Sequence, residues 1–491
     1  MKVSYGDTDP VFALATPLAE SALALIRTSG AIDLLARVFS RPEKLLSAPG
    51  NSTVHGWIVD PEDAKKIDEV IVSVYRSPRS YTGEDGADIS CHGGIAVVKA
   101  VMASLKKAGF REALPGEFTF RAFMNGKLDL TRAESVMELV AAKTGRGREQ
   151  ALRRLTGALE REISEIKTQL AEVLAGTEIY LDYSEDEFFD PSNDSNANDS
   201  NDEKNDEQAG RLPVRDLAEK AAEGLKLLAA NWRRERIYAE GALAVLAGRP
   251  NAGKSSLFNY LICEDRSIVT SAPGTTRDWI EALISVEEIP LRLADTAGLR
   301  GPGFSGLEEE TEAERIGIQR SLELLDRADL VLYVIDGAEG FTGEDREFLS
   351  ARKEAAGKKP ILILWNKADL KQPPAIDKET GALPGQLLSV SAKTGEGITE
   401  LTRSIAAALE AAPPGINGQE TTGPGSLRQK ELIDSALASL EEALALADRE
   451  EPLDIIAPLF RSAINALGEI TGEVSSADIF ELMFSRFCVG K

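Results

Sequence analysis

The chain has 491 residues, of which 43% are hydrophobic and 28% are charged, and its formal net charge at pH 7 is −24. This length and composition predict about three globular domains with buried cores. Three cysteines far apart in the sequence and two histidines argue against a disulfide framework, a clustered zinc site and histidine-rich catalysis. Because no apolar run is long enough to span a membrane and the N-terminus does not resemble a signal peptide, we expect a cytoplasmic protein without a membrane partner.

The negative charge is concentrated in one segment. Residues 182–208 contain eleven acidic residues and one lysine, and therefore 10 of the 24 excess negative charges. The middle of the segment has almost no apolar residues, so we interpret it as a disordered loop between two helices. Two basic clusters, at 146–154 and 233–236, fit either solvated helix faces or a nucleic-acid surface.

Residues 1–120 predict an N-terminal α+β domain. Its strand candidates are short and rich in branched or alternating apolar residues: Val11–Ala15, Ala22–Arg27, Ser52–Val59 and Glu69–Tyr75. A helix is predicted at Ile95–Ala108. Cys91 beside His92 suggests a thiolate pair, but adjacent side chains need not face each other, and we favour a structural role for both.

Residues 121–240 predict the first part of a helical domain. Helices are expected at Glu117–Phe123 and Asp129–Ala142, then in one long run from Arg148 to about Tyr180, and again at Val214–Tyr238. Apolar residues between Leu152 and Leu174 recur at steps of mostly three and four, which indicates one buried face along the long run.

Residues 241–411 alternate strands and helices, a pattern typical of a doubly wound parallel sheet. The strand candidates are Leu243–Ala247, Trp279–Val286, Leu291–Asp295, Leu330–Asp336, Ile361–Asn366 and Gln386–Ser391. Residues 412–491 then predict a linker and two more helices, Ser426–Asp448 and Leu453–Leu467. The doubly wound domain is therefore expected to be inserted into one helical domain.

The segment Gly248–Ser255 matches the phosphate-loop pattern G-x-x-x-x-G-K-[ST] and lies between a predicted strand and a predicted helix. Glycines let the backbone fold around an anion, and the loop N–H groups supply positive potential. We expect Lys254 to reach the β- and γ-phosphates and Ser255 to bind Mg²⁺.

Four further loops follow at strand ends, and the five together resemble the nucleotide-binding loops of Ras-like GTPases. Thr276 is expected to bind Mg²⁺, Asp295 to hold it through water, and Asp369 to pair with guanine. The predicted GTP-binding residues are Asn251, Ala252, Gly253, Lys254, Ser255, Ser256, Thr270, Ser271, Ala272, Pro273, Gly274, Thr275, Thr276, Asp295, Thr296, Ala297, Gly298, Asn366, Lys367, Asp369, Ser391, Ala392 and Lys393.

Catalysis must differ from that of Ras, because Leu299 stands where Ras-like enzymes often place a water-orienting Gln. Two candidates can fill the gap. The Asn251 side chain and the backbone carbonyls of Thr270–Thr275 can bind a monovalent cation beside the phosphates. Alternatively, Glu314 can polarise water, although taken alone it reads as a surface helix residue.

With these pieces assembled, the chain closely resembles the MnmE (TrmE) family of bacterial and organellar tRNA-modification GTPases. The resemblance covers nearly the whole length. It rests on SYTGED (Ser80–Asp85), CHGG (Cys91–Gly94), PGEFTFRAFMNGKLDL (Pro115–Leu130), GRPNAGKSSLFN (Gly248–Asn259), PGTTRD (Pro273–Asp278), DTAGLR (Asp295–Arg300), ERIGI (Glu314–Ile318) and the terminal FCVGK (Phe487–Lys491).

The resemblance implies a Ras-like GTPase domain inserted into a helical domain, preceded by an α+β folate-binding and dimerisation domain. It implies a homodimer whose nucleotide domains are brought together by GTP and K⁺, with Glu314 as the catalytic residue. K⁺ would be bound at Asn251, Thr270, Ala272 and Thr275. A folate such as 5-formyltetrahydrofolate would be bound by Arg27, Glu84, Lys127 and Lys491.

The family acts with the flavoprotein MnmG to install a (carboxymethyl)aminomethyl group at C5 of the tRNA wobble uridine. This chain departs from the family at Leu18–Ala24, where side chains replace a glycine-rich turn. Without the resemblance, Arg27 and Lys127 would read as surface charges. The competing hypotheses are an Era-like RNA-binding GTPase, against which the absence of a GxxG loop after residue 426 argues, and a dynamin-like GTPase, which lacks membrane-binding segments here.

Overall fold

The computed structural model describes Tyr5 and residues 8–184, 215–264, 280–295, 322–355, 359–373, 383, 385–410, 422–474, 480, 483–485, 487 and 490. The chain divides into two compact units. One comprises Met1–Met137, Leu155–Ala171 and Pro458–Lys491, and the other comprises Glu138–Arg154 and Glu172–Ala457. Beyond residue 184, the predicted acidic loop lies outside the described residues, and the predicted domain boundaries remain predictions.

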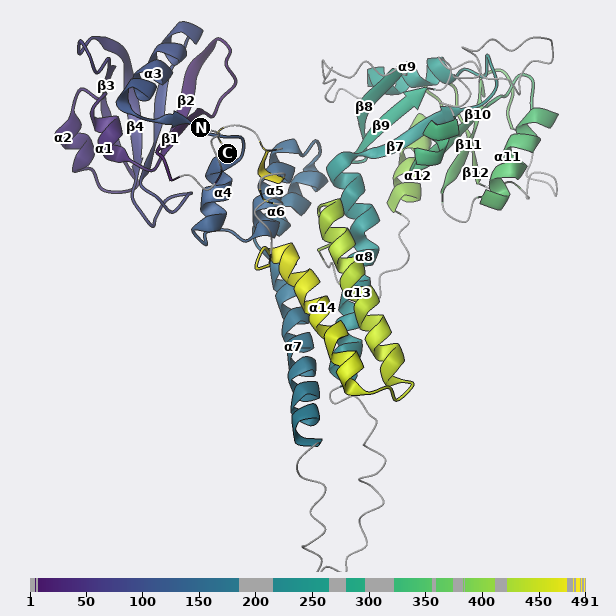
Figure 1. Ribbon diagram of the computed structural model, residues 1–491. Helices are drawn as coiled ribbons and strands as arrows, with labels where there is room; N and C mark the ends of the chain where they lie inside the picture. The colour runs from purple at the N-terminus through teal and green to yellow at the C-terminus, as the bar shows by residue number, and fades with distance from the viewer. Residues whose placement is uncertain are drawn as a thin grey trace, which may run out of the picture. The chain divides into compact units, whose positions relative to one another are not determined.

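The N-terminal part of the first unit is a six-stranded sheet in the order β3-β4-β5-β2-β1-β6 (Figure 1). Its strands are β1 (Val11–Leu14), β2 (Ser21–Ser29), β3 (Ser52–Val59), β4 (Lys66–Tyr75), β5 (Gly86–Gly93) and β6 (Arg111–Glu112). Neighbours are antiparallel except β1 and β6, which are parallel. The sequence analysis missed β5, although Ala87, Ile89 and Cys91 alternate into the core with the period of a strand.

Three helices complete this α+β fold: α1 (Ile32–Ala36), α2 (Pro42–Leu46) and α3 (Ile95–Ala108). The core between helices and sheet contains Cys91, whose Sγ donates to the Ala24 carbonyl at 3.6 Å. Burial raises the pKa of the Cys91 thiol to about 11. The exposed His92 ring instead pairs through Nδ1 with Asp68 Oδ1 at 2.7 Å. The two side chains therefore serve separate structural contacts.

An aromatic cluster ties the C-terminal residues to α4 (Glu117–Met124), which is followed by α5 (Leu130–Ala141). Phe120 contacts Tyr5 and Phe484 edge to face, with ring centroids 5.4 and 5.3 Å apart. Gly116 begins α4 with a φ of 68°, and a Cβ there would lie 2.8 Å from the Phe484 carbonyl oxygen. Only glycine tolerates both the conformation and the close approach.

The predicted long helix from Arg148 to Tyr180 is wrong as a single element. The structure has α6 (Gly145–Leu155) and α7 (Ala158–Ser184), separated at Gly157, whose φ is 84°. The expected buried face is present on α7, where Leu159, Ile163 and Leu170 have no exposed surface. Leu152, on α6, does not share it and is 48% exposed.

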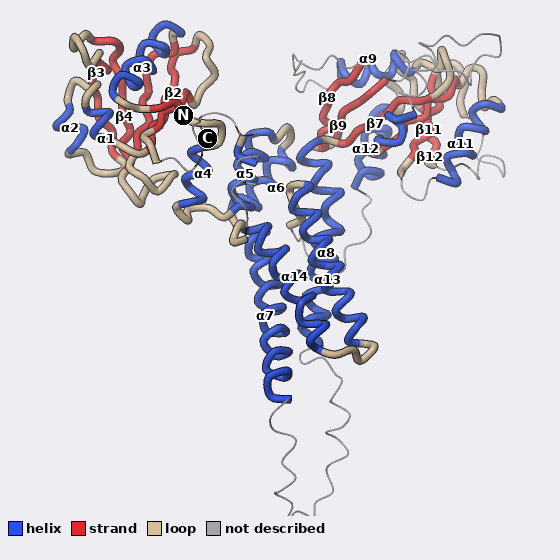
Figure 2. The backbone as a smooth tube through the Cα atoms, in the orientation of Figure 1, coloured by secondary structure: helices blue, strands red, loops and turns tan. Residues whose placement is uncertain are grey.

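In the second unit, α8 (Arg215–Glu240) packs along α13 (Leu427–Ala447), and Lys226 Nζ lies 2.9 Å from Glu441 Oε1. The chain continues from α13 into α14 (Leu453–Thr471). Because α8 immediately precedes the nucleotide-domain sheet and α13 follows it, that domain is inserted between two helices that pack together (Figure 2). Among the described residues, no helix combines the length and apolar character needed to cross a membrane.

The inserted domain has a six-stranded sheet in the order β12-β11-β10-β7-β9-β8, parallel except for the antiparallel pair β8–β9. Its strands are β7 (Ala242–Ala247), β8 (Ile280–Val286), β9 (Ile289–Asp295), β10 (Leu330–Asp336), β11 (Ile361–Asn366) and β12 (Gln386–Ser389). Its helices include α9 (Lys254–Glu264), α11 (Gly343–Ala355) and α12 (Ile398–Glu410). Apolar cores cover both faces, which confirms the predicted doubly wound fold.

Candidate functional site

The predicted nucleotide loops gather at the carboxyl edge of the inserted sheet. Strands β7, β9, β10 and β11 run parallel. At their carboxyl ends, Leu246 of β7 lies beside Asp295 of β9, and Asp336 of β10 lies beside Asn366 of β11. The loops that follow these strands therefore leave from one edge, where doubly wound folds bind their ligands. The phosphate loop leaves β7 and enters α9 at Lys254, as its motif predicts.

Two glycines of the phosphate loop cannot be replaced without moving the backbone. Gly248 has a φ of 136°, and a Cβ there would lie 2.2 Å from the Val334 carbonyl oxygen. Gly253 has a φ of 92°, and its Cβ would lie 2.2 Å from Asn366 Nδ2. Both the conformation and the crowding exclude a side chain. The glycine spacing in the motif thus has a steric cause.

The charged end of the phosphate loop is organised around Lys254 and Ser255. The Lys254 ammonium donates to the carbonyls of Gly248 and Arg249, at 2.8 Å each, so it lies across the loop it belongs to. Burial lowers the pKa of Lys254, with Asp295 opposing that effect. Ser255 Oγ donates to Asp295 Oδ2 at 2.8 Å. A hydroxyl and a carboxylate thus converge at the start of α9, and such hard oxygen ligands suit Mg²⁺.

The predicted guanine-binding loops are held together by side-chain hydrogen bonds. Asn366 is 2% exposed, donates to the Ala252 carbonyl at 2.8 Å and accepts from the Ala392 amide at 3.1 Å. Asp369 Oδ1 accepts from Ser391 Oγ at 2.7 Å. Asn366 therefore connects the phosphate loop to the Ser391–Lys393 loop, while the exposed Asp369 keeps Oδ2 for a ligand. This arrangement fits the predicted guanine pair.

Two ion pairs at this edge escaped the sequence analysis. Lys367 Nζ lies 2.5 Å from Asp336 Oδ2. Burial alone would raise the pKa of Asp336, but the Lys367 ammonium and the Ala338 amide hold it below the usual range. Arg249 of the phosphate loop contacts Glu339 Oε2 at 2.9 Å. A signal for the first pair existed, because Asp336 ends a buried strand beside the strand that ends in Asn366.

Several predicted ligands lie outside the described residues. Of the predicted K⁺ ligands, Asn251 is described: it is exposed and has a left-handed φ of 60°, and the described part of the chain provides no hydrogen bond to its side chain. An exposed amide oxygen on a loop of this conformation is free to accept a cation. The predicted site residues outside the described ranges are Thr270, Ser271, Ala272, Pro273, Gly274, Thr275, Thr276, Thr296, Ala297, Gly298, Glu314 and Lys491.

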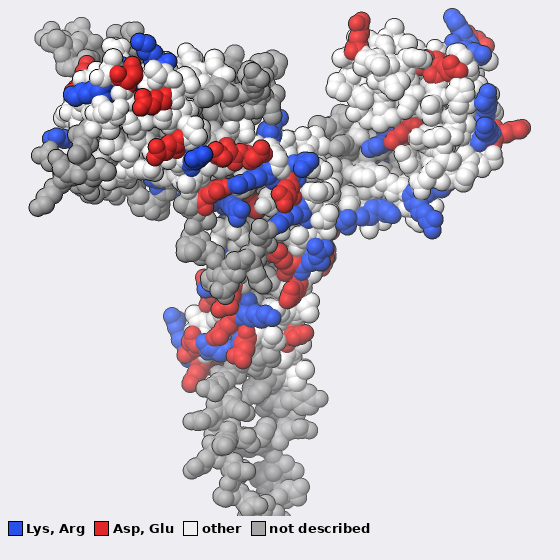
Figure 3. All heavy atoms as spheres, turned by 180° about the vertical axis from the view of Figure 1, so that it is seen from behind, with Lys and Arg blue, Asp and Glu red and all other residues white. Residues whose placement is uncertain are grey.

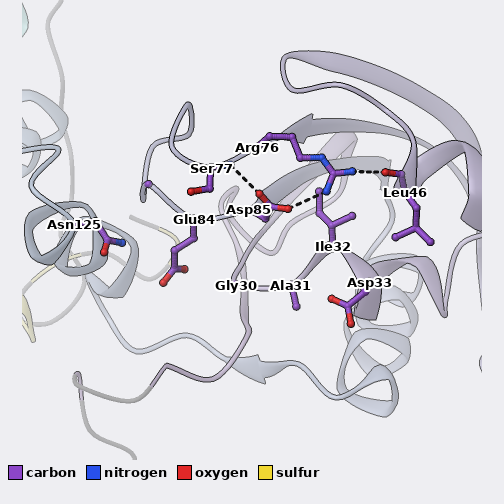
Figure 4. Close-up of a pocket in the computed structure, with 11 residues that line it drawn as sticks. Gly30, Ala31, Ile32, Asp33, Leu46, Arg76, Ser77, Glu84, Asp85 and Asn125 are labelled. Carbon is purple, nitrogen blue, oxygen red and sulfur yellow. Dashed lines mark hydrogen bonds and ion pairs between the residues drawn. The ribbon is translucent and has the colours of Figure 1, made fainter.

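The N-terminal domain has a pocket of about 570 Å³ (Figure 4). It lies between the start of α1, the end of α2, the Ser77–Asp85 loop and Asn125. Both oxygens of the Asp85 carboxylate in its wall accept hydrogen bonds from the protein: Oδ2 from Arg76 and Oδ1 from the Ser77 amide. The Glu84 carboxylate points into the space between Asn125 and Gly30.

Of the four predicted folate-binding residues, Glu84 lines this pocket. Arg27 does not line it and forms a bidentate pair with Asp88, at 2.9 and 3.2 Å, which offsets its charge. Lys127 Nζ donates to the Pro78 carbonyl at 2.9 Å, at the base of the same loop that carries Glu84. One carboxylate and one lysine therefore fit a ligand with amine donors and an anionic tail.

Three arginines of the two basic clusters form ion pairs. Arg154 is buried between Glu138, at 2.7 Å, and Glu235, at 2.6 Å. Arg236 pairs with Asp329 and Arg146 pairs with Glu410. In the view of Figure 3, Lys and Arg side chains are interspersed with Asp and Glu over the helical region. These three arginines thus hold helices to the inserted domain or to each other.

Comparisons with known proteins cover nearly the whole chain. Residues 130–488 match the model of the MnmE helical domain, and residues 10–127 match that of the GTP-binding protein TrmE N-terminus. A tRNA modification GTPase MnmE of Treponema denticola is 42% identical over 99% of both chains. Relatives with the same description from Borreliella burgdorferi and Carboxydothermus hydrogenoformans are 39% and 38% identical, over 98% of this chain and 98% and 99% of theirs. The chain therefore belongs to the MnmE family of tRNA modification GTPases, and is a GTP hydrolase that acts in tRNA modification.

Proposed function

We propose that this chain is a K⁺-dependent GTPase, activated by dimerisation, that acts with the flavoprotein MnmG to add a (carboxymethyl)aminomethyl group at C5 of the tRNA wobble uridine. The observation that carries the cation dependence is Asn251, exposed in the phosphate loop on a left-handed backbone. Leu299 has no polar atom to orient water, so charge neutralisation and water positioning must come from other groups.

The residues of the phosphate loop bind and orient the nucleotide. Loop N–H groups and the Lys254 ammonium contact the β- and γ-phosphates, and Asp369 accepts hydrogen bonds from guanine. Ser255 and Thr276 hold Mg²⁺, with Asp295 behind Ser255 at 2.8 Å. When bound, Mg²⁺ neutralises the charge that develops on the phosphate oxygens.

Hydrolysis is completed by side chains and carbonyls of this chain and its second copy. Asn251, Thr270, Ala272 and Thr275 would hold K⁺, whose positive charge would replace that of an arginine finger. Glu314 orients the attacking water. The two nucleotide domains of a homodimer associate when GTP and K⁺ are bound, so the rate of GTP turnover depends on this association.

The folate one-carbon unit is bound by the N-terminal domain, at Glu84, Lys127, Arg27 and the C-terminal Lys491. The Glu84 carboxylate in the pocket wall supports this assignment. Helix α8 is tied to the inserted domain at the amino ends of its strands: Arg236 pairs with Asp329, and Asp329 accepts from the Leu243 amide at 2.9 Å. In this proposal the state of the nucleotide is transmitted through the inserted domain to the helical domain, in a cytoplasmic complex of this chain, MnmG and tRNA.

The experiment that tests the cation dependence is GTP turnover in KCl and in NaCl at equal ionic strength. We expect turnover to fall by at least about tenfold in NaCl, because one coordinated charge at a developing anion contributes several kcal/mol. Asn251→Ala should turn over slowly in both salts while binding GTP normally. The Glu314→Ala variant should likewise keep binding. Equal rates of the wild type in the two salts would contradict the proposal.

A further inference from the structure

The motif Pro115–Leu130 contains one predicted folate ligand, Lys127. Its other polar side chains make contacts that this role does not explain. The motif holds the loop that carries Glu84 through four side chains, two on α4 and two directly after it. Thr119 pairs with Tyr81 Oη at 2.9 Å, Asn125 donates to the Thr82 carbonyl at 2.7 Å, and Lys127 donates to the Pro78 carbonyl at 2.9 Å. The fourth contact is the ion pair of Arg121 with Glu84, at 2.9 Å.

Arg121 is placed by a buried carboxylate. Glu117 has no exposed surface and accepts from Arg121 Nη2 at 2.7 Å and from Arg111 Nη2 at 2.7 Å. Arg121 Nη2 also donates to the Asp9 carbonyl at 2.7 Å. The planar guanidinium therefore has its Nε and Nη2 edge fixed by Glu117 and Asp9, which directs Nη1 toward Glu84.

The contacts to Glu84 use one of its two oxygens. Oε2 accepts from Arg121 Nη1 at 2.9 Å and from Ser29 Oγ at 2.8 Å. Ser29 has a single hydroxyl hydrogen, so Thr82, 2.7 Å away, donates to Ser29. Within the described residues no group donates to Oε1, and the carboxylate lines the pocket with a side chain 28% exposed. The network thus orients the carboxylate and leaves Oε1 to a ligand.

We propose that Arg121 is a positioning residue for folate binding, which fixes the Glu84 carboxylate so that Oε1 accepts hydrogen bonds from the amino and ring N–H groups of the bound heterocycle. This inference rests on the proposed folate function. Arg121 acts through Glu84 and does not itself contact the ligand. A lysine at this position cannot satisfy Glu117, Glu84 and Asp9 simultaneously, because its ammonium lacks the planar fork.

The test measures the Kd of (6S)-5-formyltetrahydrofolate for the full-length protein by isothermal titration calorimetry. Arg121→Lys should raise the Kd about tenfold, since the charge-assisted hydrogen bond that fixes the Glu84 carboxylate is lost. Ser29→Ala removes the other donor to the same oxygen and should raise the Kd roughly threefold. Ser29→Ala also serves as the second variant if Arg121→Lys fails to fold, since it leaves Glu117 untouched.

Arg111→Lys is the matched control. Arg111 bonds the same buried Glu117, at 2.8 and 2.7 Å, but is not a partner of Glu84. Its substitution perturbs the cluster to a similar degree and should leave the Kd within roughly twofold of wild type. GTP turnover, whose predicted residues lie in the other compact unit, should stay unchanged in all these variants. Thermal unfolding followed by circular dichroism reports whether each variant protein is folded.

A double-mutant cycle separates positioning from general support of the fold. Arg121→Lys should add no further loss in a Glu84→Gln background, because its effect acts through that carboxylate. Additive losses, an equal loss in Arg111→Lys, or an unchanged Kd in both Arg121→Lys and Ser29→Ala would each overturn the assignment. A wild-type protein that does not bind the folate would overturn the folate proposal, and this inference with it.

Discussion

The nucleotide site and the N-terminal pocket are built in different ways. In the predicted nucleotide site, the described loops each follow a strand, and the parallel sheet brings them to one edge. In the N-terminal pocket, the wall around Glu84 depends on Ser29 and Arg121, which are 55 and 37 residues away in the chain. The first design leaves contiguous motifs in the sequence, whereas the second leaves isolated polar residues in otherwise ordinary helices and strands.

The buried ion clusters of the two units also differ in their balance of charge. In the first unit, Glu117 accepts from two arginines and from the Leu114 amide. Burial alone would raise the pKa of Glu117, but these donors hold it below the usual range. In the second unit, Arg154 is shared between Glu138 and Glu235, and burial raises the pKa of Glu235 despite that arginine. Similar residue types thus produce pKa shifts of opposite sign, because the number of donors per carboxylate differs.

The largest expected effect is at Asp369, the carboxylate that we propose pairs with guanine. Asp369→Asn should weaken GTP binding by about a hundredfold or more, because two hydrogen bonds to a charged group are lost. It should also improve binding of xanthosine triphosphate, whose extra carbonyl suits the amide. Fluorescence titration with both nucleotides checks this. Glu396→Gln, an exposed substitution in the following loop, is the control; equal effects of the two variants would show that Asp369 does not face the base.

A smaller effect is expected where the backbone itself forms the site. Gly253→Ala places a Cβ 2.2 Å from Asn366 Nδ2 on a residue with a φ of 92°. We expect GTP affinity to fall roughly tenfold to a hundredfold, given about 1–3 kcal/mol for such backbone strain. Gly343→Ala is the matched control, because a Cβ there meets nothing within 4 Å. Normal GTP affinity in Gly253→Ala would contradict the steric account of the loop.

The smallest effects sharpen the contrast between the two ion clusters. The Glu117 carboxylate, with its lowered pKa, contributes stability that is present above its ordinary value of 4.5 and is lost as the pH falls below it. Glu235, with its raised pKa, contributes stability that is present below 4.5 and is lost as the pH rises through its folded value. Glu117→Gln and Glu235→Gln should therefore change the pH dependence of unfolding in opposite directions.

Hydrogen exchange provides the measurement, because it reports the local free energy of opening for α4 and α8 separately. Each variant is compared with wild type at about pH 3.5, 4.5 and 6, which spans the ordinary carboxylate range. In each variant, the helix that does not carry the substitution serves as the internal control: α8 for Glu117→Gln and α4 for Glu235→Gln. Differences of the same sign in both helices would show that the balance of donors does not set these pKa shifts.

Sequence reasoning predicted the described loops at the strand ends where the structure has them, because their motifs are local. Lys254, Ser255, Asn366 and Asp369 lie where their motifs predict, since a parallel sheet orders strand ends by rule. It missed β5, in which buried residues alternate with partly exposed ones. It also joined α6 to α7 because the helical period continues across the break at Gly157. Partners such as Arg121 for Glu84 depend on a three-dimensional arrangement that periodicity does not encode.

The most direct test of the central claim is mass spectrometry of tRNA wobble uridines from a strain that lacks this gene. The account predicts loss of the (carboxymethyl)aminomethyl modification at C5. Expression of the wild-type chain should restore it, and Lys254→Ala should not, because that variant loses the ammonium that contacts the phosphates. An unchanged modification profile in the deletion strain would contradict the account.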